Sequence, residues 1–267
     1  LEAGLAGPSS IALIEPGGRV LLDTRAPYGS PLPEAGREGV LAKVAETRRV
    51  QLSDIQLEPA AGQSLTMDMP VVFYVDPEIV NDPRYADEMV EAMTSIPTIS
   101  IVTDIANLFD PATGIYIKST GEGMAYERPC SFEYFDAEGN ALFQIDCGLR
   151  MRGGASRSQR VTPKHSFRLI FRDQYGAGKL EYPLFGEDAA DEFDTIVLRA
   201  GSNLSWPHHN GWPVYSENRL HAQYVRDPWT RATQLAMGGY ATHNHYAHLY
   251  LNGVYWGLYN PGERPSA

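Results

Sequence analysis

The residues best suited to bind an anion are concentrated between positions 148 and 172, in the stretch GLRMRGGASRSQRVTPKHSFRLIFR. This stretch holds seven Lys or Arg and no Asp or Glu, although the whole chain has a formal net charge of −11. Arg150 and Arg152 are two positions apart, so on a strand both side chains point to the same face. A guanidinium can bind a phosphate through two parallel hydrogen bonds, which makes this pair a candidate for phosphate recognition.

The loop that follows the two arginines suits the same chemistry. Gly153 and Gly154 allow the backbone to approach a ligand closely, and successive N–H groups in such a loop can form an anion-binding concavity. Ser156 adds a hydroxyl donor, and Lys164, at the start of the next strand, can reach a phosphate as a point charge. Together these residues predict a pocket for a multiply charged anion such as a nucleoside triphosphate.

The alternative is that these basic residues face solvent on ordinary strands and are balanced by carboxylates elsewhere in the chain. The glycine spacing does not decide between the two interpretations, because it matches neither the Walker loop nor the glycine-rich loop of protein kinases.

Composition restricts the remaining function classes. The chain of 267 residues is long enough for one large domain or two small ones. A sequence pI of about 5.1 argues against non-specific nucleic-acid binding. The sequence contains no run of 18 apolar residues, so it predicts no membrane-spanning helix. The sequence begins at Leu1 without a signal-peptide pattern. We therefore expect it to be part of a longer protein.

The chain contains two cysteines, Cys130 and Cys147, on either side of a predicted hairpin with the turn DAEG. If the turn is centred between residues 138 and 139, Phe132 lies opposite Ile145 and Cys130 lies opposite Cys147. A one-residue bulge would shift the last pairing. The sequence therefore leaves open a disulfide or two buried thiols, and the spacing of the cysteines offers no metal-binding pattern.

The elements predicted along the chain give an α+β fold, an antiparallel sheet with helices inserted between its strands. We expect residues 1–65 to be a small β-type appendage or linker, with a hairpin around Pro16-Gly17-Gly18, and residues 66–267 to form the main domain. The elements predicted in the main domain are a helix from Asp82-Pro83 to Pro97, a strand at 99–104, the cysteine hairpin with its second strand running into Met151, strands at 165–172 and 195–201, a helix at 228–237 with Asp227 as its N-cap, and a hairpin at 245–260 on the Asn252-Gly253 turn.

Several long segments, in the same order along the chain, resemble the spore-coat-protein-H-like (CotH) kinase family as found in large secreted bacterial proteins. The resemblance covers residues 76 to 265. The matching segments are DPEIVNDPRYADEMVEAMTSIPTISIVTDIANLFDPATGIY, YERPCSFEYFD, GLRMRGGASR, PKHSFRLIFRDQYGAGKLEYPLF, DTIVLRAGSN, QYVRDPWTRATQLAMG and HLYLNGVYWGLYNPGERP.

The resemblance implies an atypical protein-kinase-like fold that transfers phosphate from ATP with Mg or Mn, and a secreted or cell-surface location. The chain would correspond to the N-terminal lobe up to the hinge. The resemblance assigns Lys164 to the α- and β-phosphates and GLRMRGGASR to the loop above them. The helix at 228–237 would be the regulatory helix, and Asn260 to Glu263 would form the hinge near the adenine or ribose.

Two features depart from an ordinary kinase. The predicted regulatory helix has no acidic residue after Asp227, so the lysine's partner would be Asp227 itself or Glu217. The carboxylates that position the acceptor and hold metal would lie in a C-terminal lobe beyond Ala267. We therefore expect an incomplete phosphotransferase whose catalytic residues and acceptor the sequence does not identify.

A binding module without catalytic activity is the main alternative. Trp206 and Trp212 bracket a loop rich in Pro, Gly and His, and paired tryptophans can stack on sugar rings, which suits a secreted adhesion module for polysaccharide. A weaker alternative is an acidic surface protein that binds cations. On a strand, His243 and His245 share a face and His248 points the other way, whereas zinc needs three or four converging ligands, so we expect structural roles for these histidines. The sequence contains no GxSxG motif that would support a hydrolase.

Overall fold

The computed structural model describes residues 12–14, 20–23, 82–205 and 222–264. The chain divides into two compact units, Leu1–Asp87 and Glu88–Ala267. In the first unit, β1 (Ala12–Ile14) pairs antiparallel with β2 (Val20–Asp23). This pairing agrees with the hairpin expected near the N-terminus, although its Pro16-Gly17-Gly18 turn and the expected boundary at residue 65 lie outside the described residues.

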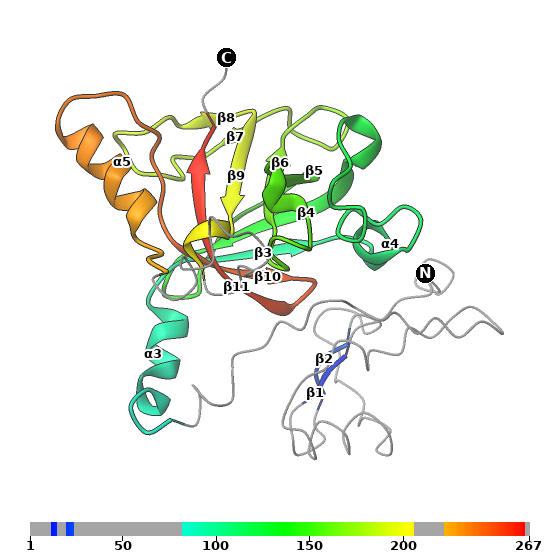
Figure 1. Cartoon of the computed structure of the whole chain (residues 1–267), viewed down its shortest axis with the longest axis horizontal. Coiled ribbons are helices and arrows are strands. Elements are labelled where there is room, and N and C mark those ends of the chain that lie inside the picture. The colour runs from blue at the N-terminus through cyan, green and yellow to red at the C-terminus, as the bar shows by residue number, and fades with distance from the viewer. Residues whose placement is uncertain (1–11, 15–19, 24–81, 206–221, 265–267) are drawn as a thin grey trace. The chain divides into compact units, whose positions relative to one another are not determined.

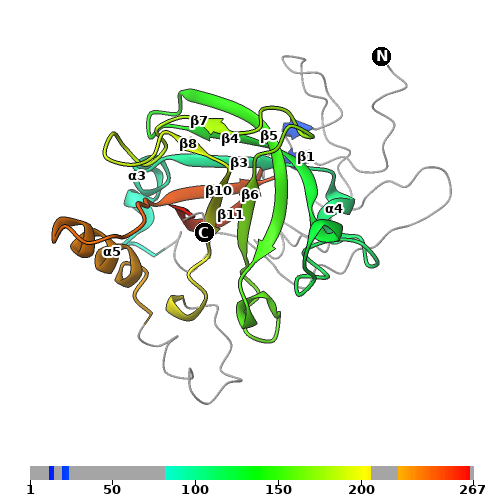
Figure 2. The same ribbon diagram turned by 90° about the horizontal axis from the view of Figure 1, so that it is seen from above.

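The second unit is built on a closed seven-stranded barrel in the order β10-β11-β9-β6-β5-β4-β3 (Figures 1 and 2). All neighbouring strands are antiparallel except β10 and β3, whose parallel pairing closes the barrel. The α+β class predicted from the sequence is confirmed. The barrel strands are β3 (Thr98–Val102), β4 (Arg128–Phe135), β5 (Ala141–Arg152), β6 (Ser166–Ile170), β9 (Thr195–Arg199), β10 (Ala247–Leu251) and β11 (Val254–Glu263).

Alternation of side chains explains why these segments form the barrel. Leu149, Met151, Phe167 and Leu169 are buried inside it, whereas the residues between them point outward. The largest fully buried side chains include Trp256, Tyr116, Tyr259, Phe132 and Phe167. Because the two sides of β5 and β6 differ strongly in polarity, a one-residue slip of either strand would bury charge, and this fixes their register.

The two tight hairpins of the barrel follow from their turns. Asn252 (φ 50°) and Gly253 (φ 78°) both adopt positive φ, as the turn joining β10 to β11 requires. In the other hairpin, Phe132 pairs with Ile145 and Cys130 with Cys147, as the sequence predicts. Its irregularity falls between Tyr134 and Phe135, close to the turn, and therefore leaves the cysteine pairing unchanged.

Short elements precede or connect the strands of the barrel. The α-helix α4 (Ile105–Phe109) begins where Asp104 accepts a hydrogen bond from the Ala106 N–H at 2.9 Å. The others are the α-helix α3 (Met89–Thr94), the 3₁₀ turns η3 (Ala86–Glu88), η4 (Met124–Tyr126), η5 (Ala155–Arg157) and η6 (Ser202–Leu204), and the strand pair β7 (Leu180–Glu181) and β8 (Glu192–Phe193). The first of the two predicted helices becomes α-helical only at Met89, because turn and 3₁₀ geometry occupy residues 83–88.

The longest helix, α5 (Arg226–Ala236), lies beside the barrel (orange in Figure 1). Its C-terminal glycines behave as predicted: Gly238 has φ 75°, and the Gly238 and Gly239 N–H groups donate to the carbonyls of Leu235 and Gln234. The predicted N-cap is wrong. The helix begins two residues earlier, with Val225 in the cap position, and Asp227 instead forms ion pairs from the first turn. None of the helices in the described residues is both long and apolar enough to cross a membrane.

Candidate functional site

One outer face of the barrel carries a row of basic side chains. Arg150 on β5 lies directly opposite Arg168 on β6, and Arg152 lies opposite Ser166. Arg168 in turn lies opposite Val197 on β9. Because the alternate residues of these strands fill the barrel interior, the arginines are forced onto the outer face together.

A cavity of about 390 Å³ opens where this face meets the glycine loop. Gly153 has φ 128°, a backbone conformation that residues with a Cβ rarely adopt, and a Cβ there would also displace the Ser156 hydroxyl, which lies 2.2 Å from its position. Gly154 faces open space. The residues that line the cavity are Gly121, Glu122, Gly123, Tyr126, Arg150, Met151, Arg152, Gly153, Gly154, Arg157, Arg168 and Arg264.

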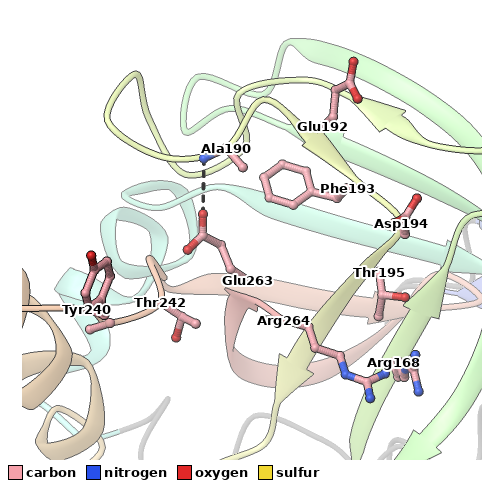
Figure 3. A pocket seen from close by; sticks show the side chains of 11 residues that line it. Arg168, Ala190, Glu192, Phe193, Asp194, Thr195, Tyr240, Thr242, Glu263 and Arg264 are labelled. Atoms are coloured by element: carbon pink, nitrogen blue, oxygen red, sulfur yellow. Dashed lines mark hydrogen bonds between the residues drawn. The ribbon is translucent and has the colours of Figure 1, made fainter. Parts of the chain in front are cut away.

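A second cavity of about 850 Å³ adjoins the first. Arg168 and Arg264 line both cavities, and their side chains lie next to one another in Figure 3. The other residues around the second cavity are Ala190, Glu192, Phe193, Asp194, Thr195, Tyr240, Ala241, Thr242 and Glu263. The two cavities therefore meet at a pair of guanidinium groups.

The guanidinium groups at this junction repel one another. Burial, and then the positive charges of Arg264, Arg150 and Arg172, lower the pKa of Arg168 to about 10. Its Nε is buried without a hydrogen-bond partner. Burial and the charges of Arg264 and Arg231 likewise lower the pKa of Arg152. An anion placed between these groups would relieve the repulsion and satisfy the unpaired donor.

Arg150 is held differently from Arg168. Its Nε and Nη2 both contact Glu127 Oε2 at 2.5 Å, and the Glu127 side chain is fully buried. Tyr175 donates its hydroxyl to the other Glu127 oxygen at 2.9 Å, and Arg172 lies 3.5 Å from that oxygen. Arg150 therefore lines the cavity with a fixed orientation, and part of its charge is neutralised by Glu127.

Lys164 lies apart from the two cavities. Its Nζ donates to the Leu258 carbonyl at 2.6 Å and sits 4.7 Å from the centre of the Tyr259 ring. Burial lowers the pKa of Lys164 to about 8. Gly257 leaves room for this contact, because a Cβ there would lie 3.2 Å from the Lys164 Nζ. The structure thus separates the predicted lysine from the predicted arginines.

Ser156 does not line either cavity. Its carbonyl oxygen lies 3.1 Å from Nδ1 of the buried His165, which ties the glycine loop to the strand after it. The loop is therefore anchored at its far end by His165 and Lys164, while its glycines face the first cavity.

The segment expected to form the hinge is instead the end of a strand. Asn260 to Glu263 pair with β9, since Asn260 lies opposite Arg199 and Glu263 opposite Ile196. Glu263 accepts hydrogen bonds from the His243 N–H at 2.7 Å and from the Ala190 N–H at 3.3 Å; the second is dashed in Figure 3. Glu263 borders the larger cavity with both carboxylate oxygens already engaged.

An ion pair that the sequence did not predict connects the basic face to α5. Arg199, at the end of β9, lies 3.2 Å from Asp227 Oδ2, and Arg231 Nε lies 3.2 Å from the same oxygen. Sequence reasoning paired Asp227 with Lys164 or with the helix backbone. The signal that could have identified Arg199 is the alternation of TIVLR, which leaves Arg199 on the outward side of a buried strand.

The histidines have local partners. His245 Nε2 lies 3.1 Å from the Tyr134 hydroxyl, and His248 contacts the Tyr255 hydroxyl and the Ala92 carbonyl. Among the described residues, no group of three or more His, Cys, Asp or Glu comes together to hold a metal ion. The other residues singled out from the sequence, Trp206, His208, His209, Trp212 and Glu217, lie outside the described part of the chain.

Comparison with known families matches residues 149–267 to the family described as CotH kinase protein. The matched region begins on β5, immediately before Arg150, and includes β6, β9, α5, β10 and β11. It therefore contains all the arginines of the outer face. No match was found among the curated proteins.

Proposed function

We propose that the arginine face binds the phosphates of ATP and forms part of a phosphotransferase, a proposal that rests on the match of residues 149–267 to the family described as CotH kinase protein. The observation that supports this most strongly is the position of Arg168 and Arg264 at the junction of the two cavities. The buried Nε of Arg168 has no hydrogen-bond partner, and an anionic ligand would accept a hydrogen bond from it.

An ion pair between a strand and a helix also supports the proposal. In protein kinases, a lysine on a central strand forms an ion pair with an acidic residue on the following helix and holds the α- and β-phosphates. Here Arg199 ends a strand of the basic face, and Asp227 lies on α5, later in the chain, with its Oδ2 3.2 Å from the Arg199 guanidinium. We assign this pair, rather than Lys164, to that role, with Arg199 carrying the positive charge.

The chain's own residues would divide the work of binding. Arg152, Arg168 and Arg264 would neutralise phosphate oxygens, and Gly153 and Gly154 would let the loop backbone approach them. Asp227 would hold Arg199 in place. ATP supplies the transferable phosphoryl group when bound; the described residues fit its phosphates, but they include no cluster for a metal ion, so no role is assigned to one.

The test is ATP binding measured by calorimetry at about 0.15 M salt, with the wild type, Arg168→Ala and Arg160→Ala. Arg160 belongs to the same basic stretch but is exposed and lines neither cavity. We expect Arg168→Ala to weaken ATP binding by about 10- to 100-fold, because it removes a charge-assisted hydrogen bond. Arg160→Ala should stay within about twofold of the wild type, since it changes only distant screened charge.

Equal losses of ATP affinity in the two variants would show that the loss comes from net charge alone and would refute a specific site. Absence of any ATP binding by the wild-type protein would refute the nucleotide proposal itself.

A further inference from the structure

Cys130 on β4 and Cys147 on β5 form a matched pair inside the barrel. They occupy the same position of the antiparallel ladder, and their Sγ atoms lie 3.5 Å apart. Both thiols are free and buried. Residues on either side of them along the same strand faces, Phe132 and Leu149, are also buried, so the pair points into the core.

The backbone already meets the requirements of a disulfide. Residues directly opposite in antiparallel strands have Cα atoms about 4.5–5.5 Å apart, and disulfides take Cα separations of about 4.4–6.8 Å. Bringing the sulfurs from 3.5 Å to a bond of about 2.05 Å needs only small side-chain rotations. We propose that Cys130 and Cys147 form an intrachain disulfide that links β4 to β5.

The pairing is unambiguous because the sequence contains only these two cysteines. With a low-molecular-weight disulfide such as oxidised glutathione as the oxidant, one cysteine thiolate attacks a glutathione sulfur and releases the first glutathione thiolate. The second cysteine thiolate then attacks the protein sulfur of the mixed disulfide and releases the second. Two protein thiols are oxidised and one glutathione disulfide is reduced to two thiols, and the two protons lost by the protein thiols end on the glutathione thiolates by way of the solvent.

The surroundings of the pair decide when the bond forms. The contact with Cys130, together with burial, raises the pKa of the Cys147 thiol, so the folded protein holds very little of the reactive thiolate. Neither sulfur is open to a bulky oxidant in the folded state. The bond therefore forms while the chain folds, and once formed it is shielded from reductants.

The position of the link has a consequence for the basic face. The register that pairs Cys130 with Cys147 also places Arg128 opposite Leu149, at the end of β4 that leads to Glu127. Glu127 contacts Arg150, one residue beyond Leu149. A covalent link at this rung stabilises the register on which the Glu127–Arg150 contact depends.

The experiment is to refold the whole chain in a glutathione redox buffer or in excess reductant, and then to alkylate it under denaturing conditions and map the peptides by mass spectrometry. After oxidative refolding we expect a cross-linked Cys130–Cys147 peptide in the monomer and no alkylation of either cysteine. The cysteines are 17 residues apart, so the oxidised form should melt about 5–10 °C higher than the reduced form.

Full alkylation of both cysteines after oxidative refolding would overturn the proposal, as would cross-linking only between chains. The variant Cys130→Ala/Cys147→Ala is the control, and its melting temperature should not depend on the redox buffer. If its melting temperature shifts as much as that of the wild type, the shift does not come from this bond and the proposal fails. The peptide map of the wild type needs no substitution, so poor folding of the variant does not affect it.

Discussion

Arg168 and Lys164 come from the same basic stretch, four positions apart, and their charges meet opposite surroundings. Arg168 lies between two cavities, beside other arginines, with a buried Nε that has no partner. Lys164 is buried against a carbonyl oxygen and the face of a tyrosine ring. The comparison shows that like charges close together in a sequence can have opposite surroundings: Lys164 holds a loop in place, and we propose that Arg168 binds a ligand.

The physical difference lies in what satisfies each cation. The Lys164 ammonium has a strong acceptor at 2.6 Å, so a ligand would have to compete with an existing hydrogen bond in a closed space. Burial and the positive charges of Arg264, Arg150 and Arg172 lower the pKa of Arg168, so an anion beside it gains both hydrogen bonds and relief of the repulsion. We therefore propose the anion site at Arg168 and its neighbouring arginines, and not at Lys164.

The largest effect is expected from Glu127→Ala, which tests how the arginines of the outer face are stabilised. The fully buried Glu127 carboxylate contacts Arg150, Arg172 and Tyr175. Removing it leaves partly buried cations unpaired and should lower the free energy of unfolding by about 3–5 kcal/mol, measured by urea denaturation. Glu122→Ala is the matched control: its side chain is 76% exposed, and it should cost less than about 1 kcal/mol. Similar costs for the two variants would contradict the structural role of Glu127.

The next largest effect is the contribution of Lys164 to the pH dependence of stability. Burial lowers the pKa of folded Lys164 to about 8, whereas the unfolded chain keeps the ordinary value of 10.5. Between these values the unfolded state binds more protons, so this group makes the free energy of unfolding rise with pH. We expect the stability of the wild type relative to Lys164→Met to rise by about 2 kcal/mol from pH 8 to pH 10.

The same variant also separates the two sides by function. Lys164→Met should bind ATP within about twofold of the wild type at neutral pH, because the lysine lines neither cavity. A loss of ATP binding as large as that of Arg168→Ala would break the comparison and restore Lys164 to the phosphate site.

The smallest effect is expected at the link between the basic face and α5. Asp227→Asn keeps the shape of the side chain but removes the charge that Arg199 and Arg231 share. We expect a loss of stability below about 1 kcal/mol and a threefold to fivefold weaker ATP affinity, on the order of one half-buried ion pair. Arg226→Ala, on the same turn of the helix but exposed, should change neither quantity. Unchanged ATP affinity in Asp227→Asn would show that Arg199 needs no positioning.

The sequence predicted the barrel strands well because their information is local. Alternation of apolar and basic residues placed Phe167 and Leu169 inside and Arg168 outside, and the Asn252-Gly253 turn located the last hairpin. The register of the cysteine hairpin also followed from counting residues on either side of its turn. Closure of the sheet into a barrel was not predicted, because it depends on the parallel pairing of β10 with β3, which lie about 150 residues apart in the chain.

The candidate site was predicted only in part for a similar reason. Arg150, Arg152, Gly153 and Gly154 line the first cavity as neighbours along the chain. Arg199, Asp227 and Arg264 come from other elements, and only the packing of β9, α5 and β11 brings them to the same face. Glu127 gave no signal at all, since nothing in its local sequence distinguishes a buried carboxylate from a solvated one.

By itself, the sequence determined which residues form strands, which faces of those strands are apolar, and how many positive charges the chain places near its glycine loop. Those properties follow from side-chain alternation and turn chemistry, which act over a few residues. Only the tertiary structure decided that Arg168 meets Arg264 at the junction of two cavities while Lys164 is buried against Leu258. Whether a charge faces a ligand or a carbonyl oxygen depends on strands distant in sequence, because burial and neighbouring charge are set by packing.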